Sequence, residues 1–376
     1  MSLWIESAHQ SLTKAGAKVC GDVVRTLRTK DRFCAILVSS PQGDEEGRAK
    51  ARPIADQAAS LLEQGTPLEQ VVKALLIALP DGEHMPFSIL QVREGRRAQL
   101  AECDAPPLFL THAGRLILLP VVEEVSQGHL IRECDFPCQD GDHIAIVSEG
   151  YVRTREQRQR WRWQDVATSV RRWTETGCDA EQLLGALIRS YHRLTGKEPA
   201  QDVTVIAMHV RPRRSATVWS GPPADPALDP VALEKLMAEP GMRIICGDTT
   251  TAIAARLLGV EPELEPRPED GWAEVPPTAR LEGVNLVTEG LVTLGQAHER
   301  VARAKRVRDL PRKTDGATRL AQMLLSADRI HFIVGLAVNP EQAADAASTI
   351  PRRQLVIGDL VRDLEEREKT VSVEYF

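Results

Sequence analysis

Long apolar runs are absent from this sequence of 376 residues. No run approaches the roughly 20 apolar residues that a membrane-spanning helix needs, which excludes a transmembrane protein. The first residues include Glu6, His9 and Gln10 and contain no apolar signal core, so export is not expected. A large surplus of one charge is absent too, because the net charge is only −6, which favours neither nucleic acid nor an anionic membrane as a partner.

Cysteine pairs and clustered histidines are missing as well. The seven cysteines are scattered, and the closest spacing is Cys134-x-x-x-Cys138 rather than Cys-x-x-Cys. We therefore expect neither a zinc site nor a disulfide framework, and we expect reduced thiols in a cytoplasmic protein. The nine histidines form neither His-Glu-x-x-His nor His-x-His, so zinc catalysis and a histidine-centred triad have no support.

The apolar pattern divides the chain near residue 212, where a proline-rich segment follows. Residues 1–211 predict helices over about 49–63, 67–79, 163–174 and 179–194. The predicted strands are spaced closely enough for antiparallel hairpins and cover 33–38, 88–92, 98–103, 108–111, 116–122, 143–148 and 202–210. Residues 212–376 alternate strands with helices, which predicts a separate α/β domain.

Three acidic residues lie at predicted strand ends, each beside a turn: Asp22, Glu149 and Asp202. Carboxylates in such positions can converge on one edge of a β-sandwich. A cluster of carboxylates suits hard divalent cations such as Mg2+ or Mn2+. A pair of these ions turns a water molecule into a nucleophile and binds a phosphoryl oxygen. Taken one at a time, however, such acids are more often plain turn residues, and their spacing alone does not decide.

Five motifs follow one another along the first 211 residues: Gly21-Asp22, the turn from Val38 to Gly47, Asp104-Ala105-Pro106-Pro107, the segment Gly141 to Gly150, and Gln201-Asp202-Val203-Thr204. Their order resembles the PPM-type metal-dependent serine/threonine phosphatases, in the branch of the stage II sporulation E phosphatase. The resemblance implies an α+β fold, a four-layer α-β-β-α sandwich. The rest of the chain resembles an extension on some bacterial members, through Gly247-Asp248-Thr249-Thr250, Val287-Thr288-Glu289-Gly290 and Asp315-Gly316-Ala317.

The chain departs from the family pattern at several positions of the implied metal site. Ser40-Pro41 stands where the family has Asp-Gly, Glu149 stands where it has Asp, and Gln201 replaces the first of two consecutive Asp residues. The resemblance implies catalytic roles for Asp22 and Glu149. It also implies a degenerate metal site at Asp22, Glu149 and Asp202, with the altered positions Ser40, Pro41 and Gln201.

The loss of two anionic ligands lowers the expected affinity for divalent cations, since affinity depends on ligand charge. The favoured hypothesis is a phosphatase-fold protein of bacterial signalling that binds a phosphoprotein or another signalling protein and has weak or absent phosphatase activity. One alternative is an active Mn2+- or Mg2+-dependent phosphatase acting on phosphoserine or phosphothreonine. Another is a sensor that binds a small anion through residues 212–376. The sequence leaves the oligomeric state open.

Three further motifs have simpler interpretations. Asp44, Glu45 and Glu46 could replace the missing ligands, but acids just before a helix are favoured there by the helix dipole alone. The basic run 153–162, beside Trp163, is interpreted as a solvated helix surface rather than a single-stranded nucleic-acid site. At Gly247-Asp248-Thr249-Thr250, capping of the next helix by a threonine is favoured over phosphate binding.

Overall fold

The computed structural model describes residues 2–29, 31–79, 84–152, 162–195, 198–266, 275–337 and 352–376. Most of the basic run, residues 153–161, lies outside these ranges. The chain divides into two compact units, Met1–Pro212 and Arg213–Phe376, so the division falls one residue beyond the boundary expected from the sequence.

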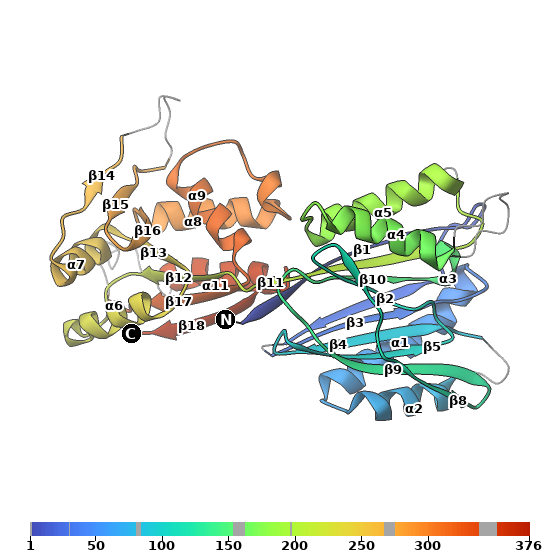
Figure 1. Ribbon diagram of the computed structural model, residues 1–376. Helices are drawn as coiled ribbons and strands as arrows, with labels where there is room; N and C mark the ends of the chain where they lie inside the picture. The colour runs from blue at the N-terminus through green and yellow to red at the C-terminus, as the bar shows by residue number, and fades with distance from the viewer. Residues whose placement is uncertain are drawn as a thin grey trace. The chain divides into compact units, whose positions relative to one another are not determined.

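Two antiparallel sheets form the centre of the first unit (Figure 1). Sheet A has the order β1-β11-β10-β6-β7 and contains β1 (Leu3–Leu12), β11 (Val203–Pro212), β10 (His143–Val147), β6 (Phe109–His112) and β7 (Arg115–Ile117). Sheet B has the order β2-β3-β4-β5-β9-β8 and contains β2 (Val23–Arg28), β3 (Arg32–Val38), β4 (Phe87–Arg93), β5 (Arg97–Cys103), β9 (His129–Pro137) and β8 (Val122–Ser126). Neighbouring strands in both sheets run antiparallel. The short spacing predicted the hairpin of β4 and β5 correctly, but β6 pairs with β10 in the other sheet and not with β5.

Helices cover the outer faces of both sheets. Sheet B carries α1 (Glu45–Glu63) and α2 (Leu68–Ala78), and sheet A carries α3 (Glu149–Val152), α4 (Trp163–Thr174) and α5 (Ala180–Thr195). One apolar core fills the space between the two sheets. A second core lies between sheet B and its helices, and a third lies between sheet A and its helices. The predicted four-layer α-β-β-α sandwich is confirmed.

The continuous apolar run in β3 follows from this layering. Phe33, Ala35 and Leu37 face the core between the sheets. The alternate residues, Cys34, Ile36 and Val38, face the helices. Because side chains alternate across a strand, a strand that is buried on both faces must be apolar at every position.

The predicted strand over 116–122 is wrong. The chain leaves sheet A after Ile117 and enters sheet B only at Val122, so the apolar run spans a connection between two sheets. Leu118 and Val122 are more than two-thirds exposed, at 76% and 71%. Leu119 and Val121 pack against the core between the sheets, yet they belong to no strand, so strand pairing and not apolar character decides the boundaries.

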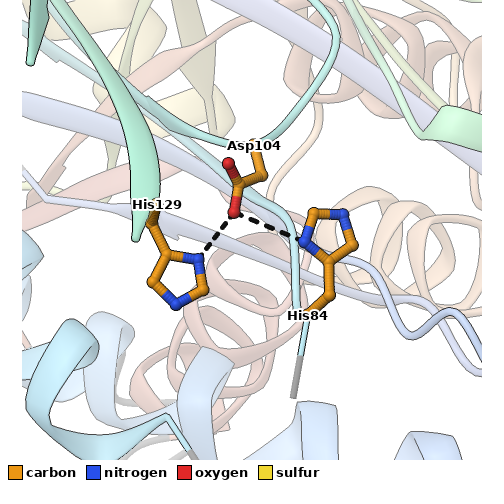
Figure 2. Close-up of side chains that lie close together, drawn as sticks. All are labelled: His84, Asp104 and His129. Atoms are coloured by element: carbon orange, nitrogen blue, oxygen red, sulfur yellow. Dashed lines mark hydrogen bonds and ion pairs between the residues drawn. The ribbon is translucent and has the colours of Figure 1, made fainter. Parts of the chain in front are cut away.

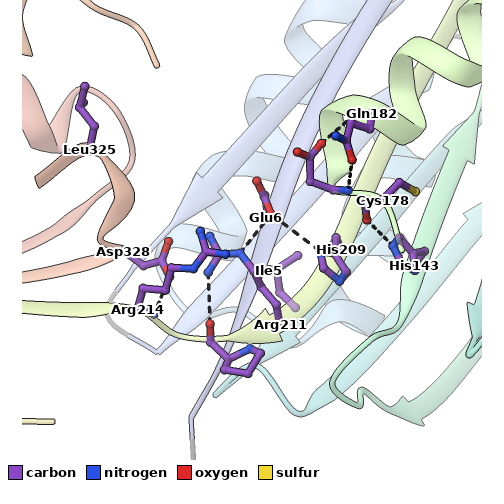
Figure 3. Close-up of polar contacts among 12 residues, drawn as sticks. Ile5, Glu6, His143, Cys178, Gln182, His209, Arg211, Arg214, Leu325 and Asp328 are labelled. Carbon is purple, nitrogen blue, oxygen red and sulfur yellow. Dashed lines mark hydrogen bonds and ion pairs between the residues drawn. The ribbon is translucent and has the colours of Figure 1, made fainter. Parts of the chain in front are cut away.

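A row of polar side chains crosses sheet A (Figure 3). Glu6 on β1 lies opposite His209 on β11, which in turn lies opposite His143 on β10. The two imidazole rings stack with their centroids 4.4 Å apart, and His143 Nε2 donates to the carbonyl oxygen of Cys178 at 2.6 Å. The pKa of Glu6 is lowered to about 2. The largest cause is the contact with the side chain of His209, and the positive charge of Arg211 lowers the pKa further, although burial raises it. His209 and His143 thus link β1, β11 and β10, and His143 also links β10 to Cys178, just before α5.

The second unit is built on a seven-stranded sheet of order β14-β15-β16-β13-β12-β17-β18. Its parallel strands are β12 (Ser215–Ser220), β13 (Met242–Cys246), β16 (Val284–Thr288), β17 (Arg329–Val334) and β18 (Thr370–Tyr375). The short strands β14 (Glu263–Leu264) and β15 (Ala279–Leu281) extend one edge in antiparallel fashion. The predicted α/β organisation is confirmed.

Helices cover both faces of this sheet. One apolar core includes α8 (Leu291–Arg303), α9 (Gly316–Ser326) and α11 (Arg352–Glu365), and the other includes α6 (Asp229–Ala238) and α7 (Asp248–Leu258). Short 3-10 helices span Pro226–Leu228 and Val307–Asp309. The expected threonine cap of α7 is wrong: the helix begins at Asp248 after Gly247, whose φ of 128° favours glycine, so Thr249 and Thr250 lie inside the first turn.

Within the described residues, no helix combines the length and the apolar character that crossing a membrane requires.

Candidate functional site

One pocket, of about 240 Å³, lies where four separate stretches of the first unit meet. Asp22 precedes β2, Ser40 and Pro41 follow β3, Glu149 begins α3, and Gln201 with Asp202 precedes β11. All six side chains proposed from the sequence, at Asp22, Ser40, Pro41, Glu149, Gln201 and Asp202, line this pocket, which we call the acid pocket. The prediction that these distant stretches converge is confirmed, whereas the roles of the individual residues stay predictions.

Asp22 is the most deeply buried acid of the pocket, with 4% of its surface exposed. Burial is the main reason why its pKa rises to about 6, and the nearby charge of Asp202 raises it further. Hydroxyl groups act in the opposite direction through hydrogen bonds, from Thr204, Ser148 and Ser39. Its Oδ2 atom has no hydrogen-bond partner among the described residues, so the carboxylate retains one unsatisfied acceptor beside the pocket.

Asp202 ties the loops of the pocket together. Its Oδ1 accepts a hydrogen bond from the backbone N–H of Lys14 at 2.7 Å, and its Oδ2 accepts one from the backbone N–H of Gly21 at 2.6 Å. Gly43, with φ of 58°, packs so closely that an added Cβ would lie 2.9 Å from Asp202 Oδ2. Each oxygen of this carboxylate therefore already accepts a hydrogen bond from a backbone N–H group.

A close backbone contact positions Glu149. The segment before it is fixed by Ser148, whose N–H donates to the carbonyl of Thr204 at 2.9 Å and whose Oγ accepts from the Thr204 N–H at 2.8 Å. Gly150 then passes against the next strand, so closely that a Cβ there would lie 2.1 Å from the carbonyl oxygen of Asp202. Only glycine allows this approach, which places Glu149 at the pocket.

The altered turn after β3 presents no negative charge to the pocket. Ser40 is buried, and its Oγ faces the start of α1, where a Cβ on Gly47 would lie only 2.2 Å away. Asp44 caps α1 by accepting the Gly47 N–H at 2.9 Å, while Glu45 and Glu46 are exposed in the first turn. These three acids thus serve the helix start, as the simpler interpretation predicted.

Lys14 also lines the pocket, although no motif in the sequence indicated it. Its Nζ donates to the backbone carbonyl of Gln42, so its positive charge lies among the loops that surround the acids. The residue follows β1 in a connection without a recognisable motif, and only the folded chain brings it to the acid pocket. A fixed cation there reduces the attraction of the pocket for another cation.

No protein-family model matches this chain, and no curated protein does either. Solved structures similar to this chain are PP2C phosphatase domains. The phosphatase domain with a regulatory fragment of SpoIIE from Bacillus subtilis is 12% identical, with 56% of this chain and 64% of that chain covered and a TM-score of 0.48. RsbX in complex with magnesium is 14% identical, with 55% and 95% covered and a TM-score of 0.43.

The SiaA-PP2C domain of Pseudomonas aeruginosa is 13% identical, with 54% of this chain and 84% of that chain covered and a TM-score of 0.44. The likeness to SpoIIE spans less than two thirds of that solved chain. At these identities the likeness concerns the fold alone.

Proposed function

We propose that this protein is a phosphatase-fold signalling protein with weak or no phosphatase activity. The observation that carries this proposal is the donor set of the acid pocket. Both oxygens of Asp202 already accept backbone N–H bonds, and the positions of two further expected ligands are the neutral Ser40 and Gln201. Hard divalent cations bind through charged oxygens, and their affinity falls when that charge is lost.

The residues present fit one cation better than a pair. Asp22 contributes a buried oxygen that has no partner in the described part of the chain and that a hard cation would satisfy, and Glu149 lines the same pocket. Asp22 and Glu149 are therefore the residues that would hold a single Mn2+ or Mg2+ ion. Such an ion, when bound, supplies a water of lowered pKa and a Lewis acid for a phosphoryl oxygen.

An active phosphatase is the second candidate. It is favoured by the Oδ2 atom of Asp22, which accepts no hydrogen bond from any residue that the structure describes. In that case Asp22 and Glu149 carry the activity, and the neutral hydroxyls around Asp22 keep its carboxylate oriented. Two-ion chemistry demands accurate placement of the attacking water, and a displacement of about 1 Å can lower the rate about a hundredfold. The incomplete donor set therefore favours binding over turnover.

For this binding role we propose a phosphoprotein or another signalling protein as the partner, in the bacterial cytoplasm. The cysteines support a reducing compartment, since all seven are free and buried. Burial raises the pKa of several of these thiols, as at Cys20 and Cys246, each to about 12, which keeps them protonated and unreactive.

The proposal is tested by assaying p-nitrophenyl phosphate and a phosphoserine peptide with Mn2+ present. We expect the wild-type rate to lie near the background rate. We expect the variant Ser40→Asp with Pro41→Gly and Gln201→Asp to gain activity by about a hundredfold or more. Robust wild-type turnover that Asp22→Asn abolishes would establish the active phosphatase instead.

A further inference from the structure

Two histidines and an aspartate meet at one edge of sheet B, outside the acid pocket (Figure 2). Asp104 follows β5, His129 begins β9, and His84 lies just before β4. The strands β4, β5 and β9 are neighbours in the sheet, so these three positions come to the same edge although the sequence separates them. Their ligand atoms all lie within 4.8 Å of one another.

The geometry points to a binding site for a divalent transition metal of the zinc class, formed by His84, Asp104 and His129. Asp104 Oδ2 faces both rings, at 2.6 Å from His129 Nδ1 and 3.4 Å from His84 Nδ1. Around a tetrahedral zinc ion with bonds of about 2.0–2.1 Å, ligand atoms lie about 3.3 Å apart. The distance between His84 Nδ1 and Asp104 Oδ2 already matches this value. The distance between His129 Nδ1 and Asp104 Oδ2 needs to lengthen by less than about 1 Å when a metal ion replaces the hydrogen bond.

Two of the three side chains are held rigidly before any metal arrives. His129 directly follows the two-residue turn Gln127-Gly128, in which both residues have positive φ, the geometry of a tight hairpin turn. Asp104 has φ of 49°, a conformation that aspartate tolerates better than most residues, and its Oδ1 accepts the Leu130 N–H at 2.9 Å. This leaves Oδ2 directed at the two imidazole rings.

The donor chemistry selects the class of metal. Two imidazole nitrogens and one carboxylate oxygen suit Zn2+, Co2+ or Ni2+ better than Mg2+ or Ca2+, which prefer oxygen alone. Three protein ligands leave a fourth position for water, and His84 is half exposed, so this position is open to solvent. The site is thus separate in chemistry from the acid pocket, whose donors are oxygens.

A hydrogen bond that merely fastens the hairpin is the competing explanation, and the chain offers a matched control for it. His112 Nδ1 lies 2.7 Å from Asp142 Oδ1, and the other oxygen of Asp142 accepts the Gln139 N–H at 2.7 Å. This pair repeats the contact between His129 and Asp104. It is not part of a cluster of three or more potential metal ligands among the described residues. It should therefore bind no zinc.

The test is a calorimetric titration of Zn2+ into the full chain, with Co2+ absorption spectra to report a tetrahedral nitrogen and oxygen environment. We expect one Zn2+ per chain. His84→Ala and His129→Ala should weaken binding by more than about tenfold, since even outer-shell changes at metal sites cost about 10–100-fold. His112→Ala should leave the affinity unchanged.

Asp22→Asn separates this site from the acid pocket, because it should leave Zn2+ binding intact whatever it does to Mn2+ binding. His84→Ala is the decisive variant, since a half-exposed side chain can be removed without loss of the fold, which circular dichroism verifies. Absence of Zn2+ binding to the wild type, or equal binding by wild type and His84→Ala, would overturn the proposal.

Discussion

Replacing Asp22 by asparagine should change the pH dependence of stability of the first unit. The variant keeps the shape of the side chain and removes an ionisable group that is only 4% exposed. Burial, supported by the charge of Asp202, raises the pKa of Asp22 from 3.8 to about 6. Because the folded protein has the higher pKa, the stability that the neutral carboxyl contributes is complete below about pH 3.8 and is lost as the pH rises through about 6.

The magnitude follows from the size of this shift. About two pKa units correspond to roughly 3 kcal/mol of destabilisation of the wild type once the carboxylate is fully ionised. Near pH 5 about half of that penalty is present, and near pH 8 all of it. Asp22→Asn lacks the titration, so its stability relative to the wild type should increase by about 1.4 kcal/mol between about pH 5 and about pH 8.

The assay is urea unfolding near these two pH values, followed by hydrogen exchange in peptides from β3 and β10, which report on the first unit. Asp202→Asn is the matched comparison. Its amide nitrogen cannot accept a hydrogen bond, so it should lose a backbone contact with Lys14 or Gly21 and be less stable than the wild type at both pH values. A stability difference between wild type and Asp22→Asn that is the same at both pH values would refute the reasoning.

Three more predictions concern the same unit. Lys14→Met should raise Mn2+ affinity about fivefold in calorimetry, since one nearby unit charge contributes about 1 kcal/mol; no change would place its charge too far away to matter. Gly150→Ala should lower the free energy of unfolding by about 3 kcal/mol or more through a backbone clash, whereas Gly185→Ala, in α5 against a flexible side chain, should be neutral or stabilising. Arg132→Met should cost about 3 kcal/mol or more, because it removes the counter-charge 3.0 Å from the buried Glu102, and a double variant with Glu102→Gln should recover much of the loss.

Periodic and capped segments could be predicted from the sequence because their signals are local. The run Phe33 to Val38 is apolar at every position, and the structure buries both of its faces. The helix Trp163–Thr174 was predicted to its ends. The following helix was predicted to start at about residue 179, where Asp179 accepts the Gln182 N–H at 2.7 Å. Local propensity and pattern suffice for such segments.

Strands whose stability depends on distant partners were missed. β1 (Leu3–Leu12) has only Ile5 buried, and its ten residues pair with β11 almost two hundred residues away. β9 (His129–Pro137) likewise mixes charged and apolar residues and depends on β5 and β8 for its pairing. A half-exposed strand of mixed polarity gives a weak pattern, so its existence is decided by pairing and not by composition.

The acid pocket could be located but not explained from the sequence. Motif order indicated which stretches meet, and Asp22, Glu149 and Asp202 all line the pocket. The engagement of both Asp202 oxygens by backbone, and the presence of Lys14, depend on loop geometry that no motif encodes. The histidine cluster at sheet B was invisible for the same reason, since its members lie on three different strand ends.

Calorimetric titration of Mn2+ tests the central claim most directly. The wild type should bind weakly and take up at most one ion in the acid pocket. The variant Ser40→Asp with Pro41→Gly and Gln201→Asp, which restores the missing charges, should bind at least about tenfold more tightly. Tight binding of two Mn2+ ions by the wild type, abolished by Asp22→Asn, would contradict the account.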